Sequence, residues 1–178
     1  MALVLYAGFA AAALAWMHWR EPGQIAIRLG VGGAGTWTRV LAAGGGIGIG
    51  VVALSAALTG LFGWARELER QFAAVLGRLT ALEILILAGS SGVGEELLFR
   101  GAVQPAIGWT AASLLFGAVH VPLNRSLWPW PAFAAGVGFL FGCEESWTGS
   151  LWTPVVSHAA VNGLNLWRIC SRADANGK

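Results

Sequence analysis

Three apolar stretches of the chain carry polar side chains that could perform hydrolysis together. A carboxylate can act as a general base, an imidazole can carry a proton, and an amide can donate hydrogen bonds to a developing oxyanion. An ionisable group at the centre of a bilayer costs roughly 2.5–3.5 kcal/mol, so such residues indicate a function or a strong pairing. The set comprises Glu95, Glu96 and Arg100 in the first stretch, His120 in the second, and His158 with Asn162 in the third.

Spacing within each stretch indicates which of these side chains share a helix face. Glu96 and Arg100 are four residues apart, so on a helix they can form an ion pair that neutralises one acid. Glu95 is rotated by about 100° from its neighbour and gains no partner from its own helix. His158 and Asn162 are again four residues apart. We therefore expect three helices to converge, so that Glu95 is satisfied by polar groups from the other two.

Each member of the set also has a purely structural interpretation. The Glu96–Arg100 pair is by itself more typical of helix stabilisation than of catalysis, and Asn162 alone is typical of hydrogen bonding between membrane helices. One histidine in an apolar stretch fits interhelical hydrogen bonding as well as it fits a reaction. Asn124 and Asn165 are interpreted as ordinary loop or helix-end residues. The combination, and no single member, favours a hydrolytic site.

The composition indicates that these stretches lie in a membrane. Of the 178 residues, 56% are hydrophobic and 11% are charged, whereas a soluble domain has roughly 25% charged residues. Ten tryptophans fall near the ends of the apolar stretches, where an indole ring suits the headgroup layer. The Lys and Arg residues form no dense basic block, which argues against nucleic acid as a partner. The lipid bilayer is therefore the expected surrounding.

Six apolar segments are candidates for membrane helices, since a span needs about 20 predominantly apolar residues. The first lacks the positive start of a secretory signal, so we interpret it as a retained membrane helix. The expected fold is therefore all-α, a polytopic membrane helix bundle of about six transmembrane helices with a polar site in its core. The segments are about 2–17, 38–64, 80–104, 107–122, 129–145 and 149–169.

The segments group into one integral membrane domain with three parts. Residues 1–79 hold two N-terminal membrane helices and their connecting loops, including a polar connection at 66–78. Residues 80–170 hold the core helices, and residues 171–178 form a polar tail. A further polar break is expected at 144–146, between the last two segments. The polar set thus lies entirely in the middle part of the chain.

The distribution of basic residues predicts the orientation of the chain in the membrane. With the N-terminus inside, the inner loops and tail hold seven Lys and Arg residues, and the outer loop holds three. The positive-inside rule then places both termini in the cytoplasm. The expected location is the cell inner (plasma) membrane, as a multi-pass chain. Simple alternation of spans puts Glu95 and His120 at different depths. If they meet, one helix must be short, kinked or re-entrant.

Small residues in the second segment predict how the helices pack. The glycine-rich run at 44–50 lies inside an apolar segment. A phosphate-binding loop would need a strand before it and a helix after it. The run therefore predicts close contact between two membrane helices.

Three short motifs in the polar stretches resemble the signature of a known family. GEELLFRG at 94–101 matches an EExxxR motif, FGAVH at 116–120 an FxxxH motif, and HAAVN at 158–162 an HxxxN motif. In this order, they resemble the CPBP family of glutamic-type intramembrane endopeptidases. That family includes the type II CAAX prenyl endopeptidases and bacterial abortive-infection membrane proteins. The resemblance covers about residues 80–165.

The resemblance implies an intramembrane protease and a role for each member of the set. Glu95 with His120 would activate a water molecule for attack on a peptide carbonyl, while His158 and Asn162 would stabilise the oxyanion. The substrate would be a membrane-associated protein or peptide, such as the C-terminal tail of an exported protein, and no cofactor would be needed. The supporting residues would be Glu96, Arg100 and Phe116.

Three competing interpretations stay open on the sequence. A catalytic zinc could use Glu and His ligands, but no HExxH motif is present. A non-enzymatic immunity or partner-binding protein could use the same polar set to fix helix packing. A small proton-coupled transporter would call for an inverted repeat, and the sequence contains no internal repeat.

Overall fold

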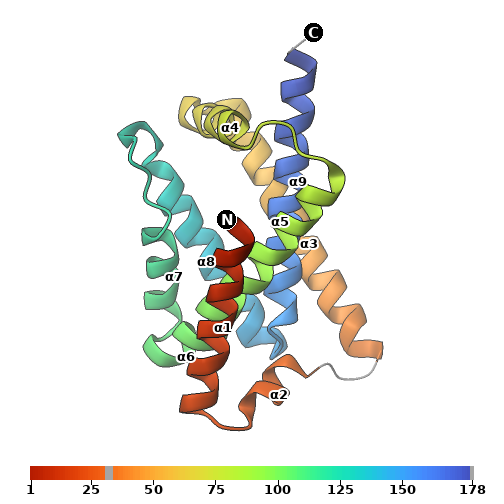
Figure 1. Cartoon of the computed structure of the whole chain (residues 1–178), viewed down its shortest axis with the longest axis vertical. Coiled ribbons are helices and arrows are strands. Elements are labelled where there is room, and N and C mark those ends of the chain that lie inside the picture. Colours follow the sequence, from red (N-terminus) through yellow and green to blue (C-terminus); the bar gives the residue numbers. More distant parts are fainter. Residues whose placement is uncertain (31–33, 177–178) are drawn as a thin grey trace.

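Apolar helical stretches alternate with short turns that contain Gly and Pro, and this pattern produces an all-helical bundle (Figure 1). The computed structural model describes residues 1–30 and 34–176, and every regular element within them is a helix. The elements are α1 (Ala2–Arg20), α2 (Gln24–Leu29), α3 (Ala34–Leu61), α4 (Gly63–Leu76), α5 (Ala81–Glu96), the π-helix η1 (Leu97–Val103), α6 (Gln104–Ile107), α7 (Trp109–Ala118), the 3₁₀-helix η2 (Arg125–Leu127), α8 (Pro129–Thr148) and α9 (Trp152–Asn176).

Each of the six predicted apolar segments contains a helix, which confirms the helical membrane bundle. By length and hydropathy, however, only α1 and the Thr36–Leu61 part of α3 qualify as single-helix spans among the described residues. The stretch from Gly63 to Ile107 would add a third span, but it is bent by 112° between α4 and α5. Length and hydropathy alone thus identify two or three of the six expected spans among the described residues, and α7, for example, has only ten residues.

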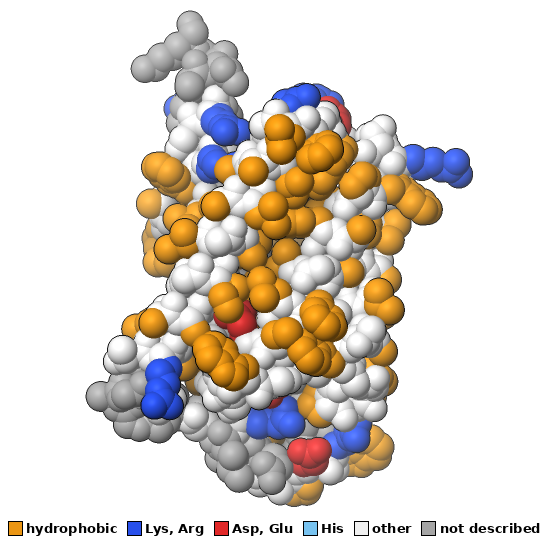
Figure 2. Space-filling model, turned by 180° about the vertical axis from the view of Figure 1, so that it is seen from behind, with side chains coloured by type: hydrophobic (Ala, Val, Ile, Leu, Met, Phe, Trp, Pro, Cys, Tyr) orange, Lys and Arg blue, Asp and Glu red, His pale blue; other side chains and the backbone are white. Residues whose placement is uncertain are grey.

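The surface agrees with a membrane location. Hydrophobic side chains spread over the middle of one face, while most Lys and Arg side chains lie toward its two ends (Figure 2). Large apolar side chains on separate helices are widely exposed, among them Leu85 at 69% and Leu114 at 63%. Apolar area of this extent is unfavourable in water. Lipid chains would cover it.

Helix α9 runs through the centre of the bundle and packs against α3 and α5 (Figure 1). Glycines allow α3 to approach it closely. A Cβ atom added to Gly44 would lie 2.7 Å from the carbonyl oxygen of Thr153, and one added to Gly48 would lie 2.8 Å from Cβ of Ala160. The close helix contact predicted from the glycine-rich run is therefore confirmed at these two positions.

We expect Gly48→Ala to lower the free energy of unfolding by about 1–3 kcal/mol, because the added methyl group must displace α9. The matched control is Gly46→Ala on the same helix, where an added Cβ meets nothing within 4 Å. Alanine favours the helix there, so this variant should be as stable as the wild type or more so. Thermal unfolding of the detergent-purified proteins makes the comparison. Equal Tm values for the two variants would contradict the close contact.

Helix α5, which carries Glu95 and Glu96, begins at a capping box and runs into a π-helix. The hydroxyl of Thr80 accepts the N–H of Glu83 at 3.3 Å, and the N–H of Thr80 donates to the Glu83 carboxylate at 2.8 Å. After Glu96 the helix widens into η1. π-helical turns are rare in proteins overall, but those that occur often lie at functional sites. Here the wide turn carries Arg100, which is buried at 2% exposure.

The short length of α7 explains how Glu95 and His120 come to lie at the same depth in the bundle. Its ten residues rise only about 15 Å, roughly half of the 30 Å hydrocarbon thickness of a bilayer. The helix therefore ends part-way along the bundle (Figure 1), and His120 just beyond it comes within 3.9 Å of Glu95. The structure confirms the prediction that a short or kinked helix brings these residues together.

Two connections between helices differ from the expectations. The polar connection at 66–78 contains α4, whose apolar side chains recur every fourth residue and line a cavity, as described below. The break expected at 144–146 lies instead at 149–151, because α8 continues to Thr148 and Gly149 then adopts a φ of +65°. Within the polar tail predicted at 171–178, the chain is helical to Asn176, and residues 177–178 lie outside the described part of the chain.

Candidate active site

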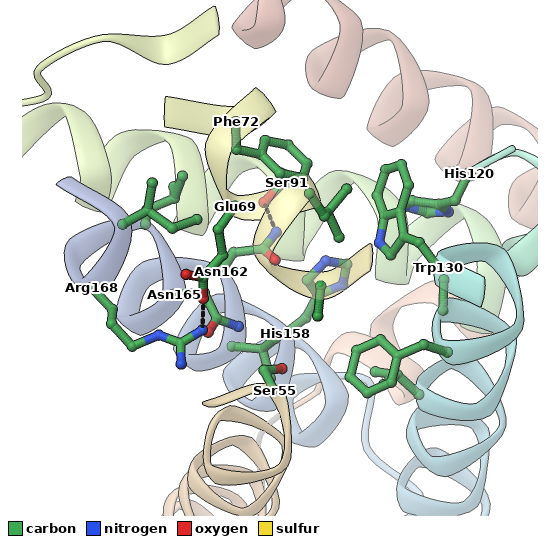
Figure 3. A pocket seen from close by; sticks show the side chains of 18 of the residues that line it. Ser55, Glu69, Phe72, Ser91, His120, Trp130, His158, Asn162, Asn165 and Arg168 are labelled. Atoms are coloured by element: carbon green, nitrogen blue, oxygen red, sulfur yellow. Dashed lines mark hydrogen bonds and ion pairs between the residues drawn. The ribbon is translucent and has the colours of Figure 1, made fainter. Parts of the chain in front are cut away.

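A cavity of about 430 Å³ lies between α4, α5, α8 and α9 (Figure 3). Most of its wall is apolar, so charges inside it are weakly screened. Phe116 lines it, whereas the Glu96 and Arg100 side chains are buried beside it. All four predicted catalytic side chains line the cavity, namely Glu95 from α5, His120 from beyond α7, and His158 and Asn162 from α9.

Glu95 and His120 face each other in one part of this cavity. Oε2 of Glu95 lies 3.9 Å from Nε2 of His120, which is too far for a hydrogen bond. Nδ1 of His120 lies 2.6 Å from the carbonyl oxygen of Phe116, and Nδ1 must carry the hydrogen because a carbonyl only accepts. Neutral His120 therefore presents an unprotonated Nε2 toward Glu95. The Glu95 carboxylate and Nε2 of His120 are thus two proton acceptors on either side of a small part of the cavity.

Glu96 is a buried hub that joins two helices. Its Oε1 accepts from Nη1 of Arg100 at 3.0 Å, so the predicted ion pair is present, and its side chain is 0% exposed. The same oxygen lies 2.7 Å from Nδ1 of His158 on α9. Nη2 of Arg100 also donates to the carbonyl of Gly138 at 2.7 Å. Sequence reasoning found the pair within the helix but not the bond that fixes His158 to it.

Phe116 packs between Arg100 and His120. The guanidinium carbon of Arg100 lies 4.6 Å from the centre of the Phe116 ring, a cation–π distance. The same ring lies 4.7 Å from the ring of His120 and meets Phe99 edge to face at 4.9 Å. Phe116 thus contributes a carbonyl that fixes the tautomer of His120 and a ring that covers the buried cation.

Asn162 is oriented by a residue that sequence analysis missed. Its Nδ2 donates to the hydroxyl of Ser91 at 2.8 Å, and Ser91 lies one helical turn before Glu95 on the same face of α5. The amide keeps a second N–H that is not used in this bond. The ring of Trp130 stands edge to face over His120 at 5.4 Å (Figure 3). The spacing of Ser91 from Glu95 was a signal that could have identified it.

A second set of polar side chains, outside the predicted catalytic set, lines the part of the cavity beneath α4. The Glu69 carboxylate accepts from Oγ1 of Thr59 at 2.8 Å and pairs with two guanidinium groups of α9, from Arg168 and, at 2.9 Å, from Arg172. Asn165 lines the cavity beside them (Figure 3). Sequence analysis treated Asn165 as an ordinary helix-end residue. The partners Glu69 and Arg168 are 99 positions apart, so no local pattern links them.

Another buried acid lies outside the cavity. The expected break at 144–146 made Glu144 a loop residue, but it is in α8 and 1% exposed. The hydroxyl of Ser157 lies 2.5 Å from Oε1 of Glu144 and donates toward the carbonyl of Gly44 at 3.0 Å. This contact ties α8, α9 and α3 together. Glu144 therefore helps to hold the helices of the bundle together. Its partner Ser157 is 13 positions away on another helix.

The cavity offers few ligands for a metal ion. Within residues 1–30 and 34–176, no three side chains of the His, Cys, Asp and Glu types are grouped to hold one ion. Glu95 and His120 provide two such ligands, whereas a catalytic zinc takes three protein ligands and a water molecule.

Comparison with known proteins finds a family match over the part of the chain that holds the four residues predicted to be catalytic. Residues 77–164 match the family described as type II CAAX prenyl endopeptidase Rce1-like. Over 83 residues the chain is 36% identical to the uncharacterized protein YpbD of Bacillus subtilis (strain 168), which covers 46% of this chain and 42% of that relative. The match thus spans less than half of the relative's length. No solved structure matches the chain. Residues 77–164, which contain all four cavity residues predicted to be catalytic, therefore belong to the Rce1-like family, in agreement with the CPBP resemblance.

Proposed function

We propose that the chain is an intramembrane endopeptidase of the glutamic type, which hydrolyses a peptide bond in a membrane-associated protein or peptide. The observation that carries the proposal is the Glu95–His120 pair, held 3.9 Å apart in an apolar cavity by two different helical segments. The family match supports the protease class. The glutamic catalytic type is our proposal; the CPBP resemblance implies it, and the Glu95–His120 geometry supports it.

The separation of the pair suits one water molecule. A water at about 2.8 Å from each partner can bridge Oε2 of Glu95 and Nε2 of His120 across 3.9 Å. Both partners accept hydrogen bonds, so the water donates both of its hydrogens and directs a lone pair into the cavity. Transfer of one proton to Glu95 would leave a hydroxide-like nucleophile facing the peptide carbonyl. As the C–N bond breaks, His120 would relay this proton from Glu95 to the leaving nitrogen, which restores the Glu95 carboxylate.

The other two side chains suit the oxyanion that forms in this attack. The free N–H of Asn162 can donate to it, while Ser91 holds the amide in place. His158 has its Nδ1 bound to Glu96, so its Nε2 becomes a donor when the ring is protonated.

We expect Asn162→Ala to lower kcat by roughly 10²–10³-fold with little change in KM, because the amide acts on the oxyanion and not on the bound peptide. Ser91→Ala is the matched comparison, since it removes only the group that orients the amide. It should cost much less than Asn162→Ala. A fluorogenic cleavage assay on the purified variants measures both. Equal losses in kcat and in substrate affinity for Asn162→Ala would assign the amide to substrate binding.

We also propose that the protein is a multi-pass protein of the inner membrane with the α4 end of its cavity on the cytoplasmic side. The two ends of the bundle differ in basic charge, and the positive-inside rule places the richer end in the cytoplasm. The α4 end carries Arg66, Arg70, Arg78, Arg125, Arg168 and Arg172, and the opposite end carries Arg20, Arg28 and Arg39.

The experiment that tests the proposal is cleavage of peptides by the purified full chain. A set of internally quenched apolar peptides is presented in proteoliposomes, with a chelator present so that a metal protease is silenced. Cleavage in the chelator supports the proposal. Cleavage that the chelator abolishes, or no cleavage of any membrane-associated substrate by a folded protein, contradicts it.

A further inference from the structure

Glu144 is a buried acid that the proposed reaction does not use. It is 1% exposed and lies where α8 meets α9. Oε1 contacts the hydroxyl of Ser157, whereas Oε2 is buried and has no hydrogen-bond partner among residues 1–30 and 34–176. An ionised carboxylate has two oxygens that only accept hydrogen bonds, and in a protein interior both normally find donors. Glu144 therefore lacks the surroundings of an ionised acid.

Arg100 is the cation that acts on Glu144, and its hydrogen bonds go to other groups. Its Nη1 donates to Glu96 at 3.0 Å, and its Nη2 donates to the carbonyl of Gly138 at 2.7 Å. Glu96, on α5, balances the charge of Arg100 and also contacts Nδ1 of His158 on α9. An ionised Glu144 would therefore be a second carboxylate beside one guanidinium group, and it would repel Glu96.

The other titratable groups on the helices around Glu144 supply no positive charge to it. On α8, Cys143 carries a thiol, and Glu145 pairs at 3.7 Å with Arg28 of α2. Arg39 is the single ionisable side chain of α3, and it is exposed. A buried charge without a partner costs so much free energy that the group binds a proton and becomes neutral instead. These surroundings therefore favour the neutral form of Glu144.

The hydrogen atoms available at Ser157 lead to the same conclusion. Its hydroxyl oxygen lies 3.0 Å from the carbonyl oxygen of Gly44 on α3 and 2.5 Å from Oε1 of Glu144. Each of these distances is short enough for a hydrogen bond between two oxygens. A hydroxyl has one hydrogen, and a backbone carbonyl only accepts. Both contacts are hydrogen bonds only if Ser157 donates to Gly44 and a protonated Glu144 donates to Ser157.

We propose that Glu144 is a neutral carboxylic acid in the folded protein and that its proton holds α3 against α9. The acid donates to Ser157, and Ser157 donates to Gly44. When the acid releases its proton to solvent, the carboxylate becomes an acceptor, and the hydroxyl of Ser157 turns its hydrogen from Gly44 to Glu144. The contact between α3 and α9 then loses this hydrogen bond. The proposal is independent of whether the chain cleaves peptides.

The position of this relay connects it to the wall of the cavity. Gly44 lies at a close approach of the two helices, where an added Cβ would be 2.7 Å from the carbonyl oxygen of Thr153. Further along α3, the side chains of Ser55, Leu58 and Thr59 line the cavity. Release of the proton from Glu144 therefore loosens the helix that forms one wall of the proposed active site. The relay is a pH-sensitive device built into the packing of α3.

The pH dependence of unfolding tests whether Glu144 is neutral. The folded chain would keep a proton that the unfolded chain loses above about pH 4.3, so stability falls as the pH rises. We expect the unfolding equilibrium constant of the wild type, divided by that of Glu144→Gln, to rise at least about tenfold between about pH 5 and about pH 8. Glutamine cannot ionise, and its N–H can replace the acid hydrogen on Ser157. Denaturant titration of the detergent-purified proteins at each pH measures both constants.

The matched control is Glu67→Gln, the same change at a partly exposed acid of α4. Both carboxylate oxygens of Glu67 accept from Arg70, so this acid is ionised in the folded and the unfolded chain over this pH range. Its substitution should leave the pH dependence of the wild type unchanged. A constant ratio of wild type to Glu144→Gln across the range would overturn the inference. So would a Glu144→Gln protein that does not fold, because glutamine preserves the contacts of a neutral acid.

Two further measurements test the proton and the helix contact without relying on global unfolding. The infrared difference spectrum between the wild type and Glu144→Gln at neutral pH should contain the carbonyl band of a protonated carboxylic acid, and its absence would overturn the inference. Hydrogen exchange of the α3 backbone amides, corrected for the intrinsic effect of pH, should accelerate at alkaline pH in the wild type but not in Glu144→Gln. Equal acceleration in both proteins would show that the proton on Glu144 does not hold α3.

Discussion

Replacing Glu95 by glutamine is expected to lower kcat for peptide cleavage by roughly 10²–10⁴-fold, the range that a general base contributes. The substitution keeps the size of the side chain but removes the acceptor that would take a proton from water. Among residues 1–30 and 34–176, Glu95 has no hydrogen-bonded ion partner, since His120 lies 3.9 Å away, so the loss of its charge strands no opposite charge. Thermal unfolding should therefore change little.

The matched control is Glu144→Gln, an identical change at a buried acid of the same bundle. Glu144 contacts Ser157 and does not line the cavity, so its substitution should leave kcat near that of the wild type. The two variants separate a catalytic role from a general need for buried acids. If Glu95→Gln is fully active while its fold is intact, Glu95 is not the base. If it instead unfolds the protein, the packing interpretation of the polar set gains support.

The largest effect on stability is expected for Arg100→Met, at about 3–5 kcal/mol of lost unfolding free energy. Removing one partner of a buried ion pair leaves the other charge without compensation. Glu96 is 0% exposed and would keep only His158, while the carbonyl of Gly138 would lose its donor. Thermal or denaturant unfolding in detergent measures the loss.

An exposed pair on α4 provides the control for this change. Arg70 is paired with Glu67 three positions before it, but its side chain is 71% exposed. Solvent screens exposed pairs and they contribute little to stability, so Arg70→Met should be nearly neutral. The double variant Glu96→Gln with Arg100→Met should regain part of the stability, because it removes the stranded charge. A small loss for Arg100→Met alone would show that Glu96 is neutral in the folded protein.

Much of the site could be predicted from local spacing. The i and i+4 relation of Glu96 and Arg100 predicted their ion pair, which is present at 3.0 Å. The presence of polar groups in three apolar stretches predicted a shared pocket, and Glu95, His120 and Asn162 do line one cavity. These predictions succeeded because a helix fixes the relative direction of neighbouring side chains and because buried polar groups need partners.

The rest depends on which helices meet, and on where helices stop. The bond between Glu96 and His158 joins residues 62 positions apart, and nothing local distinguishes it from a bond to Glu95. The helix α4 was interpreted as a polar connection because its exposed charges, such as Glu67 and Arg70, conceal an apolar face that only the cavity reveals. The length of α7 was also not predictable from its apolar character, since its ten residues are too few for a full span by length.

Mass spectrometry of the products formed from one membrane-associated peptide tests the central proposal most directly. The purified wild type, Glu95→Gln and His120→Ala proteins are incubated with the same peptide in proteoliposomes containing a chelator. We expect the wild type to produce two complementary fragments whose masses sum to that of the peptide plus one water, and both variants to produce almost none. Formation of the same fragments at the same rate by folded Glu95→Gln protein would contradict catalysis by the Glu95–His120 pair.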